Sequence, residues 1–335
     1  MPKKRRIISN DDGWIMSNMT DPVTPETIKE MTDFIRRIRA RMDEAGAERG
    51  RHLDLLVRVP PTLSDSARIG LDVERWIKEG AVDLVAAGGG FIPFEQPIRE
   101  FVVAAEGTDC QILGSFEALR WMLDEEALRA LAARFWDAGV DGFYLFNYFS
   151  TPNEWKRRVL GEMVDRERLP RLSKRYELDH TDRIASKDAH VGAFRYAIPH
   201  AQLPVLLEET LPDGGSVLLM DIADDAGAAG SAKLGLGVDD IADEDEIDIR
   251  VNGESLAWDS RHVSNDGWGY HVFDGDVYHA TMSIETVEGT LIEFDVPTSA
   301  LRKGINEVTV RLIKGATPRL RPAMLKEGRL SINYA

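Results

Sequence analysis

The sequence is poor in cysteine and lacks long apolar runs. Cys110 is the single cysteine among 335 residues, which excludes an intramolecular disulfide and a cluster of thiolate metal ligands. Its neighbours, Cys-Gln-Ile-Leu-Gly, predict a buried strand and therefore an inert thiol. No apolar run approaches the roughly 20 residues that a membrane-spanning helix requires, so we expect no membrane partner.

Positive charges are outnumbered by negative charges. The chain has 41 Lys and Arg against 57 Asp and Glu, a formal net charge of −16. A field of this sign repels nucleic acid and anionic membranes, so neither is expected as a partner. The basic start, Lys3 to Arg6, is not followed by an apolar stretch of signal-peptide length, and we expect a soluble, cytoplasmic protein. With 43% hydrophobic residues, the chain can supply cores for two domains.

Short apolar strands alternate with helices in the first half. A helix is expected to begin after Thr24, with Thr24 as N-cap and Pro25 as its first residue. Strands separated by crossover helices pair in parallel, which predicts an incomplete (β/α) TIM-like barrel of about five units over residues 1–168. The strands are expected at residues 6–10, 53–59, 82–87, 111–116 and 140–147.

The sequence pattern changes in the second half of the chain. Residues 169–201 are a charged stretch that we interpret as a connector. From residue 202 to 335, short alternating strands follow one another, and Asn252-Gly253 is a strong hairpin signal. This pattern predicts an all-β sandwich, jelly-roll-like, as an accessory domain.

Framework segments between residues 34 and 147 carry a family resemblance. They are Phe34–Arg39, Leu56–Pro60, Gly70–Trp76, Glu79–Asp83 and Asp141–Asn147. In these segments the chain resembles the glycoside hydrolase family-10-like proteins, glycosidases with a TIM barrel. The resemblance implies a hydrolase acting on a saccharide, with the β-sandwich as an appended domain. It also implies that several central β/α units are missing here, including a strand that ends in an acidic motif.

Glycoside hydrolysis requires two carboxyl groups, about 5 Å apart for retention or roughly 6.5–9.5 Å apart for inversion. In a barrel they lie at the carboxyl ends of strands. The candidates in such positions are Glu117, Asp11 and Asp12. The alternatives are that Glu117 faces a helix N-terminus and that Asp-Asp-Gly is a plain turn.

Candidate saccharide-binding residues lie near the same strand ends. Polar groups there could hold sugar hydroxyls, and aromatic rings could stack on sugar rings; the candidates are Arg58, Asn147, Glu95, Trp14, Tyr148 and Trp155. The alternatives are hydrogen bonding at the barrel rim and a hydrophobic cover. Asp83 and Asp141 begin their strands instead, and we interpret them as structural.

We expect no metal and no cofactor. His180, His190 and His200 match no metal-binding spacing, and the acidic segment 239–248 is interpreted as a solvated loop. Gly88–Gly90 lacks the continuation of a phosphate-binding loop. The rival to a glycosidase is a non-catalytic protein on the same scaffold that binds a saccharide or a protein. Open edges of an incomplete barrel predict a homodimer, or a sandwich packed on those edges.

Overall fold

The computed structural model describes twelve segments of the chain: residues 23–88, 94–117, 125–146, 153–179, 182–184, 195–197, 201–207, 215–264, 268–274, 281–287, 290–315 and 321–334. The expected strand at 6–10 lies outside them. The described residues cluster into two compact units. The parallel-sheet unit contains residues 23–88, 96–117 and 138–146, and the antiparallel unit contains 94–95, 125–137 and the described residues from 153 onward.

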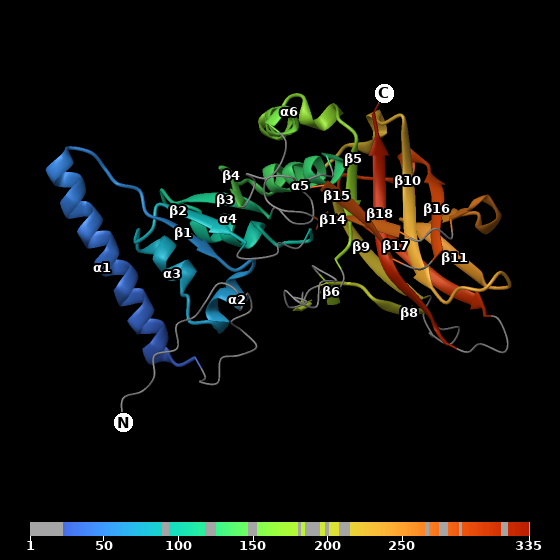
Figure 1. The fold of residues 1–335 in the computed structure, drawn as a ribbon, viewed down its shortest axis with the longest axis horizontal. Helices are drawn as coiled ribbons and strands as arrows, with labels where there is room; N and C mark the ends of the chain where they lie inside the picture. The colour runs from blue at the N-terminus through green and yellow to red at the C-terminus, as the bar shows by residue number, and fades with distance from the viewer. Residues whose placement is uncertain are drawn as a thin grey trace. The chain divides into compact units, whose positions relative to one another are not determined.

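A four-stranded parallel sheet organises the first unit (Figure 1). Its order follows the chain, β1-β2-β3-β4, with strands β1 (Leu56–Val59), β2 (Leu84–Ala87), β3 (Gln111–Glu117) and β4 (Gly142–Phe146). The helices are α1 (Pro25–Arg49), α2 (Leu63–Arg68), α3 (Val73–Lys78) and α4 (Arg99–Ala105). Parallel pairing of the four expected strands from residue 53 onward is therefore confirmed.

Helix α1 begins as the sequence predicts, with Thr24 as its N-cap. Thr24 and Thr27 form a capping box, Pro25 is the first helical residue, and Gly50 ends the helix at φ 66°. One face of α1 buries Thr32, whose hydroxyl accepts a hydrogen bond from the indole of Trp76 at 3.0 Å. This bond fixes α1 against α3 in a region that excludes water.

Two aspartates accept backbone hydrogen bonds at the amino-terminal edge of the sheet. Asp83 Oδ2 accepts the backbone N–H of Leu55 at 2.6 Å, and Asp141 Oδ2 accepts that of Ile112 at 2.8 Å. Burial opposes ionisation of Asp83, but the bonds from Leu55 and His52 and the charge of Arg39 keep its pKa below the ordinary value. These contacts support the structural interpretation of both aspartates. Cys110 beside them is buried, which raises its pKa to about 12, as expected of an inert thiol.

The second unit combines two helices with antiparallel sheets. The helices are α5 (Glu125–Ala138) and α6 (Asn153–Val164). One sheet has the order β13-β16-β10-β18-β5, with β8 also paired to β18. Its strands are β5 (Lys174–Glu177), β8 (Val205–Leu207), β10 (Ser231–Asp239), β13 (His262–Ser264), β16 (Thr290–Val296) and β18 (Ala323–Asn333).

The other large sheet has the order β12-β11-β17-β9. Its strands are β9 (Ser216–Ile222), β11 (Glu246–Val251), β12 (Glu254–Leu256) and β17 (Gly304–Lys314). Contacts of β12 with β16 and of β8 with β17 join the two sheets. Buried and exposed residues alternate along β9 and β17, so each strand gives one face to the core. The antiparallel character expected of this region is confirmed.

Shorter elements complete the unit. Two strand pairs are β6 (Asp182–Ile184) with β7 (Arg195–Ala197), and β14 (Trp268–Asp274) with β15 (Thr281–Val287). The 3₁₀ helices are η4 (Leu169–Arg171), η5 (Ala226–Ala228), η6 (Trp258–Ser260) and η7 (Thr298–Ala300). The predicted turn at Asn252-Gly253 joins β11 to β12, with φ of 51° and 86°. Strand β5, which lies within the stretch interpreted as a connector, pairs with β18.

A buried ion pair joins Lys174, the first residue of β5, to Asp224, which lies between β9 and η5. The side chain of Lys174 is 0% exposed, and its Nζ lies 2.9 Å from Asp224 Oδ1. The Tyr176 hydroxyl donates to Asp224 Oδ2 at 3.0 Å, and Lys174 also donates to the carbonyl of Leu172 at 2.8 Å. Every charge in this cluster therefore has a partner, which is the condition for burying it.

Removing one member of that pair should be costly. We expect Asp224→Ala to lower the free energy of unfolding by about 3–5 kcal/mol, because Lys174 is left buried without its counter-ion. Lys303→Ala, which breaks the exposed pair of Lys303 with Asp137, should cost under about 1 kcal/mol. Urea denaturation followed by tryptophan fluorescence measures both, and equal losses would contradict the assignment of a buried pair.

Candidate functional site

One face of the parallel sheet carries polar and aromatic side chains. In register, Arg58 on β1 pairs with Ala86 on β2, and Ser115 on β3 pairs with Tyr144 on β4. Partners in a parallel ladder and residues two apart along a strand share a face. Arg58, Ser115, Tyr144 and Phe146 therefore lie on the same face. The opposite face is apolar and buried, and includes Val59, Val85, Ala87, Ile112 and Phe116.

Arg58 reaches across this face. Its guanidinium carbon lies 3.8 Å from the ring centroid of Phe146 and 5.8 Å from that of Tyr144. Strands β1 and β4 are the two ends of the described sheet, about 14 Å apart if three strand spacings lay flat. The contact therefore requires the sheet to curve toward this side, which makes the face concave. We call Arg58, Ser115, Tyr144 and Phe146 the concave-face cluster.

The cluster combines a cation, ring faces and a buried hydroxyl. The Arg58 Nε–H donates to the carbonyl of Gly88 at 3.0 Å, which fixes the guanidinium over the rings at the carboxyl end of the sheet. Ser115 is 0% exposed, and its hydroxyl has no hydrogen-bond partner among the described residues. Buried polar groups are usually hydrogen-bonded, so this hydroxyl is a point where a bound water or ligand atom would be stabilised.

The predicted catalytic residues are only partly located. Glu117 is the last residue of β3 and the register partner of Phe146, so it lies at the carboxyl end of its strand as expected, although its side chain is outside what the structure describes. Asp11 and Asp12 lie outside the described residues, and so do the predicted binding residues Trp14, Asn147 and Tyr148.

The other predicted binding residues belong to different surroundings. Arg58 lies in the concave-face cluster. Trp155 lies on α6, where its indole donates to Glu125 of α5. Glu95 is part of the antiparallel unit, although its chain neighbours from Gln96 onward belong to the parallel-sheet unit.

Glu95 and Asp179 are joined by two hydrogen bonds, each from the backbone N–H of one residue to the carboxylate of the other. The N–H of Glu95 donates to Asp179 Oδ2 at 2.7 Å, and the N–H of Asp179 donates to Glu95 Oε2 at 2.6 Å. Glu95 Oε1 accepts from the side-chain amide of Gln202. That amide also pairs with the backbone of Leu219, donating to its carbonyl at 2.8 Å and accepting its N–H at 2.7 Å. Both oxygens of Glu95 are therefore occupied by protein donors, which indicates a structural role for this carboxylate.

The surroundings of Glu95 disfavour its negative charge. Burial and the nearby carboxylate of Asp179 raise the pKa of Glu95 to about 7, against the opposing hydrogen bonds from Asp179 and Gln202 and the charge of Arg134. Sequence reasoning missed Asp179 and Gln202, because they are 84 and 107 residues away and match no motif.

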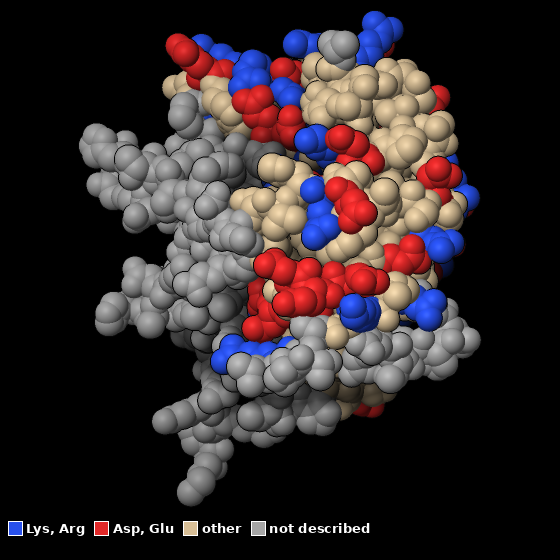
Figure 2. Space-filling view, turned by 90° about the vertical axis from the view of Figure 1, so that its right-hand side faces the viewer, with Lys and Arg blue, Asp and Glu red and all other residues tan. Residues whose placement is uncertain are grey.

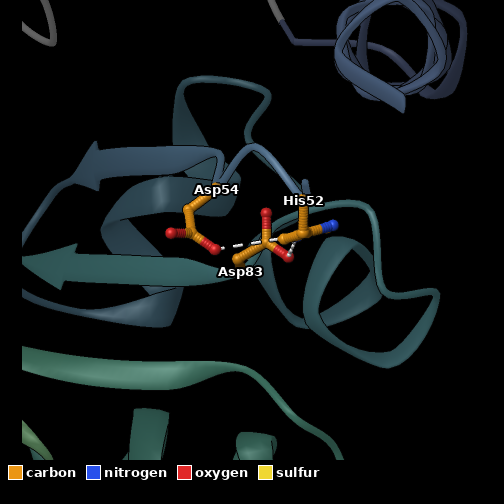
Figure 3. A group of neighbouring side chains, drawn as sticks. All are labelled: His52, Asp54 and Asp83. Atoms are coloured by element: carbon orange, nitrogen blue, oxygen red, sulfur yellow. Dashed lines mark hydrogen bonds and ion pairs between the residues drawn. The ribbon is translucent and has the colours of Figure 1, made fainter. Parts of the chain in front are cut away.

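Acidic side chains also gather on the antiparallel unit, as Figure 2 shows for one face. In the segment 239–248, Asp240, Asp243, Glu244 and Glu246 are exposed, and Asp239 is paired with Lys326. These exposures agree with a solvated loop only in part, because Asp245 is buried and accepts the N–H of Ala242, and strand β11 begins at Glu246. Among the described residues, the group whose atoms lie close enough together to hold a metal ion is His52, Asp54 and Asp83, at the amino-terminal edge of the parallel sheet (Figure 3).

Comparison with known proteins assigns the chain to no family. No family model matches the chain, and no curated protein is significantly similar to it. Within the described residues, no helix has both the length and the apolar character needed to cross a membrane.

Glu95→Gln should remove a pH dependence of stability. The folded protein holds the Glu95 proton more tightly than the unfolded chain, whose carboxyl titrates near 4.5. The resulting stabilisation is complete below that pH and is lost as pH rises through about 7. Between these values we expect the free energy of unfolding of the wild type to fall by about 2 kcal/mol relative to the variant.

Urea denaturation at several pH values measures this difference. Glu307→Gln, on the exposed face of β17, is the matched control and should follow the wild type. Parallel pH curves for wild type and Glu95→Gln would contradict the assignment.

Proposed function

We propose that this protein binds a saccharide on the concave face of its parallel sheet, on a scaffold related to glycosidase barrels. The observation that carries the proposal is the Arg58 guanidinium held over Phe146 and beside Tyr144 at the carboxyl end of the strands. Ligands of parallel α/β folds bind at that end of the strands. The framework resemblance to the family-10-like glycosidases points to the same ligand class.

The chemistry of the cluster suits a polyhydroxylated ring. The ring of Tyr144 is partly exposed and can stack on the C–H face of a sugar, while its hydroxyl and the guanidinium N–H groups of Arg58 can bond sugar hydroxyls. Together these groups offer apolar contact and directional hydrogen bonds side by side, as sugar recognition requires.

Whether the site also hydrolyses its ligand depends on two carboxylates. Glu117, at the end of β3, is the proposed acid or nucleophile, and Asp11 or Asp12 is the proposed second group. By the same register, Glu117 shares this face with its partner Phe146, and its side chain lies outside the described residues. The second candidate function is a non-catalytic saccharide-binding protein on the same scaffold.

Tyr144→Ala should weaken saccharide binding at least tenfold, because about 1.4 kcal/mol of stacking and hydrogen bonding is removed. A glycan array identifies the ligand, and calorimetry then compares the variants. Phe34→Ala is the matched control, since Phe34 is an exposed ring of α1 that also lies beside an arginine, with Arg37 at 5.8 Å. Equal binding by wild type and Tyr144→Ala would exclude the concave face as the site.

Glu117→Gln separates binding from hydrolysis. A catalytic role predicts that hydrolysis of the bound glycan is lost while affinity stays within about twofold. Absence of hydrolysis in the wild type as well, with binding retained, would establish the non-catalytic function.

The incomplete-barrel interpretation makes a further prediction. Strands β1 and β4 each have one partner among the described strands, and such edges attract other strands unless they are covered. If a second copy covers them, light scattering after size exclusion should give twice the chain mass of 37.4 kDa. A monomeric mass would exclude the homodimer, and the edges of β1 and β4 would then have to be covered by other parts of the same chain.

A further inference from the structure

Three side chains of types that bind metal ions lie close together at the amino-terminal edge of the parallel sheet. His52 and Asp54 lie just before β1, and Asp83 immediately precedes β2. Figure 3 shows the three side chains pointing toward one another. His52 Nε2 lies 2.7 Å from Asp83 Oδ1 and 3.7 Å from Asp54 Oδ1, and one ligand atom from each residue lies within 4.8 Å of the others.

The two oxygens of Asp83 have separate partners. Oδ2 accepts from the N–H of Leu55 and from Arg39 Nη1, each at 2.6 Å. Oδ1 is the oxygen that faces His52. The fold thus holds the carboxylate in place through one oxygen and presents the other to the imidazole.

Arg39 is itself immobilised. It is 8% exposed, and it donates to the carbonyl of Leu53 at 2.8 Å and to Asp43 Oδ1 at 2.8 Å. Outer groups that orient a ligating carboxylate are a regular part of metal sites, because they reduce the ordering needed when the ion binds.

The local charge favours a divalent cation. Asp43, Asp54 and Asp83 carry three negative charges around the single positive charge of Arg39, an excess of two when His52 is neutral. A neutral imidazole is also the form that ligates metals. A divalent cation bound to these side chains would neutralise the two excess negative charges.

The spacing of the ligand atoms suits a small ion. Zinc bonds of about 2.0–2.1 Å in a tetrahedral arrangement place ligand atoms roughly 3.3–3.4 Å apart. The two distances from His52 Nε2, 2.7 Å and 3.7 Å, bracket that value. Small rotations of the exposed His52 and Asp54 side chains would therefore form three bonds, with a fourth position open to water.

We propose that His52, Asp54 and Asp83 form a binding site for a divalent transition-metal ion of the zinc type. One imidazole nitrogen with two carboxylate oxygens is a ligand set that zinc accepts, whereas Mg²⁺ and Ca²⁺ prefer oxygen ligands throughout. The site is independent of the proposed saccharide site, since it lies at the opposite edge of the same sheet. It departs from the expectation of no metal, which rested on the single cysteine, the spacing of His180, His190 and His200, and the acidic segment 239–248.

Isothermal titration of the untagged full-length chain with Zn²⁺ tests the proposal. We expect His52→Ala and Asp54→Asn each to weaken one Zn²⁺-binding event at least tenfold. His262→Ala and Asp259→Asn, which change an exposed histidine and an exposed aspartate of the antiparallel unit, should leave it unchanged. Asp83 is left intact, because its loss would also remove the acceptor for Leu55.

A second measurement covers the case in which a variant is less stable. Zn²⁺ should raise the thermal midpoint of the wild type and of both controls but not that of His52→Ala or Asp54→Asn, each compared with its own metal-free midpoint. A hundredfold excess of Mg²⁺ should not displace Zn²⁺. Equal Zn²⁺ affinity in wild type and both site variants, or displacement by Mg²⁺, would overturn the proposal and leave an ordinary His–Asp hydrogen bond.

Discussion

The parallel sheet depends on a carboxylate that accepts a backbone hydrogen at the start of a strand. Asp83 joins the residue before β1 to the residue before β2, and Asp141 makes the equivalent bond to Ile112 on β3. Ile112 is buried, and an unpaired N–H at such a position would cost free energy. These bonds fix where neighbouring strands start and hence their register. The register in turn places Arg58, Ser115 and Tyr144 on one face.

The two edges of that sheet carry different chemistry for this reason. At the amino-terminal edge, carboxylates are required by the fold, and Asp83 has one oxygen left over to meet His52. At the carboxyl edge, Arg58 donates to the carbonyl of Gly88 and holds its guanidinium over the ring of Phe146. The cation-binding proposal and the saccharide-binding proposal both follow from this division.

Sequence reasoning predicted the features that depend on neighbouring residues. The N-cap and first residue of α1, the turn at Asn252-Gly253, and the strands carrying Arg58 and Tyr144 are all determined by local pattern. It could not predict contacts between distant segments. The sequence marks Glu95 as a candidate saccharide-binding residue, because its partners Asp179 and Gln202 lie 84 and 107 residues away in the chain and match no motif. His52 and Asp83 are 31 residues apart, and only parallel pairing of β1 with β2 brings them together.

The amide of Gln202 has a consequence for how molecules of this protein meet one another. Strand β9 is the last strand of its sheet among those described, and Val217 and Leu219 on it are exposed. An apolar outer strand with free backbone groups is a template on which another chain can add a strand. The carboxamide of Gln202 occupies both backbone groups of Leu219, as a peptide of a neighbouring strand would. A single side chain thereby interrupts the ladder at its midpoint, and the sheet ends within its own molecule.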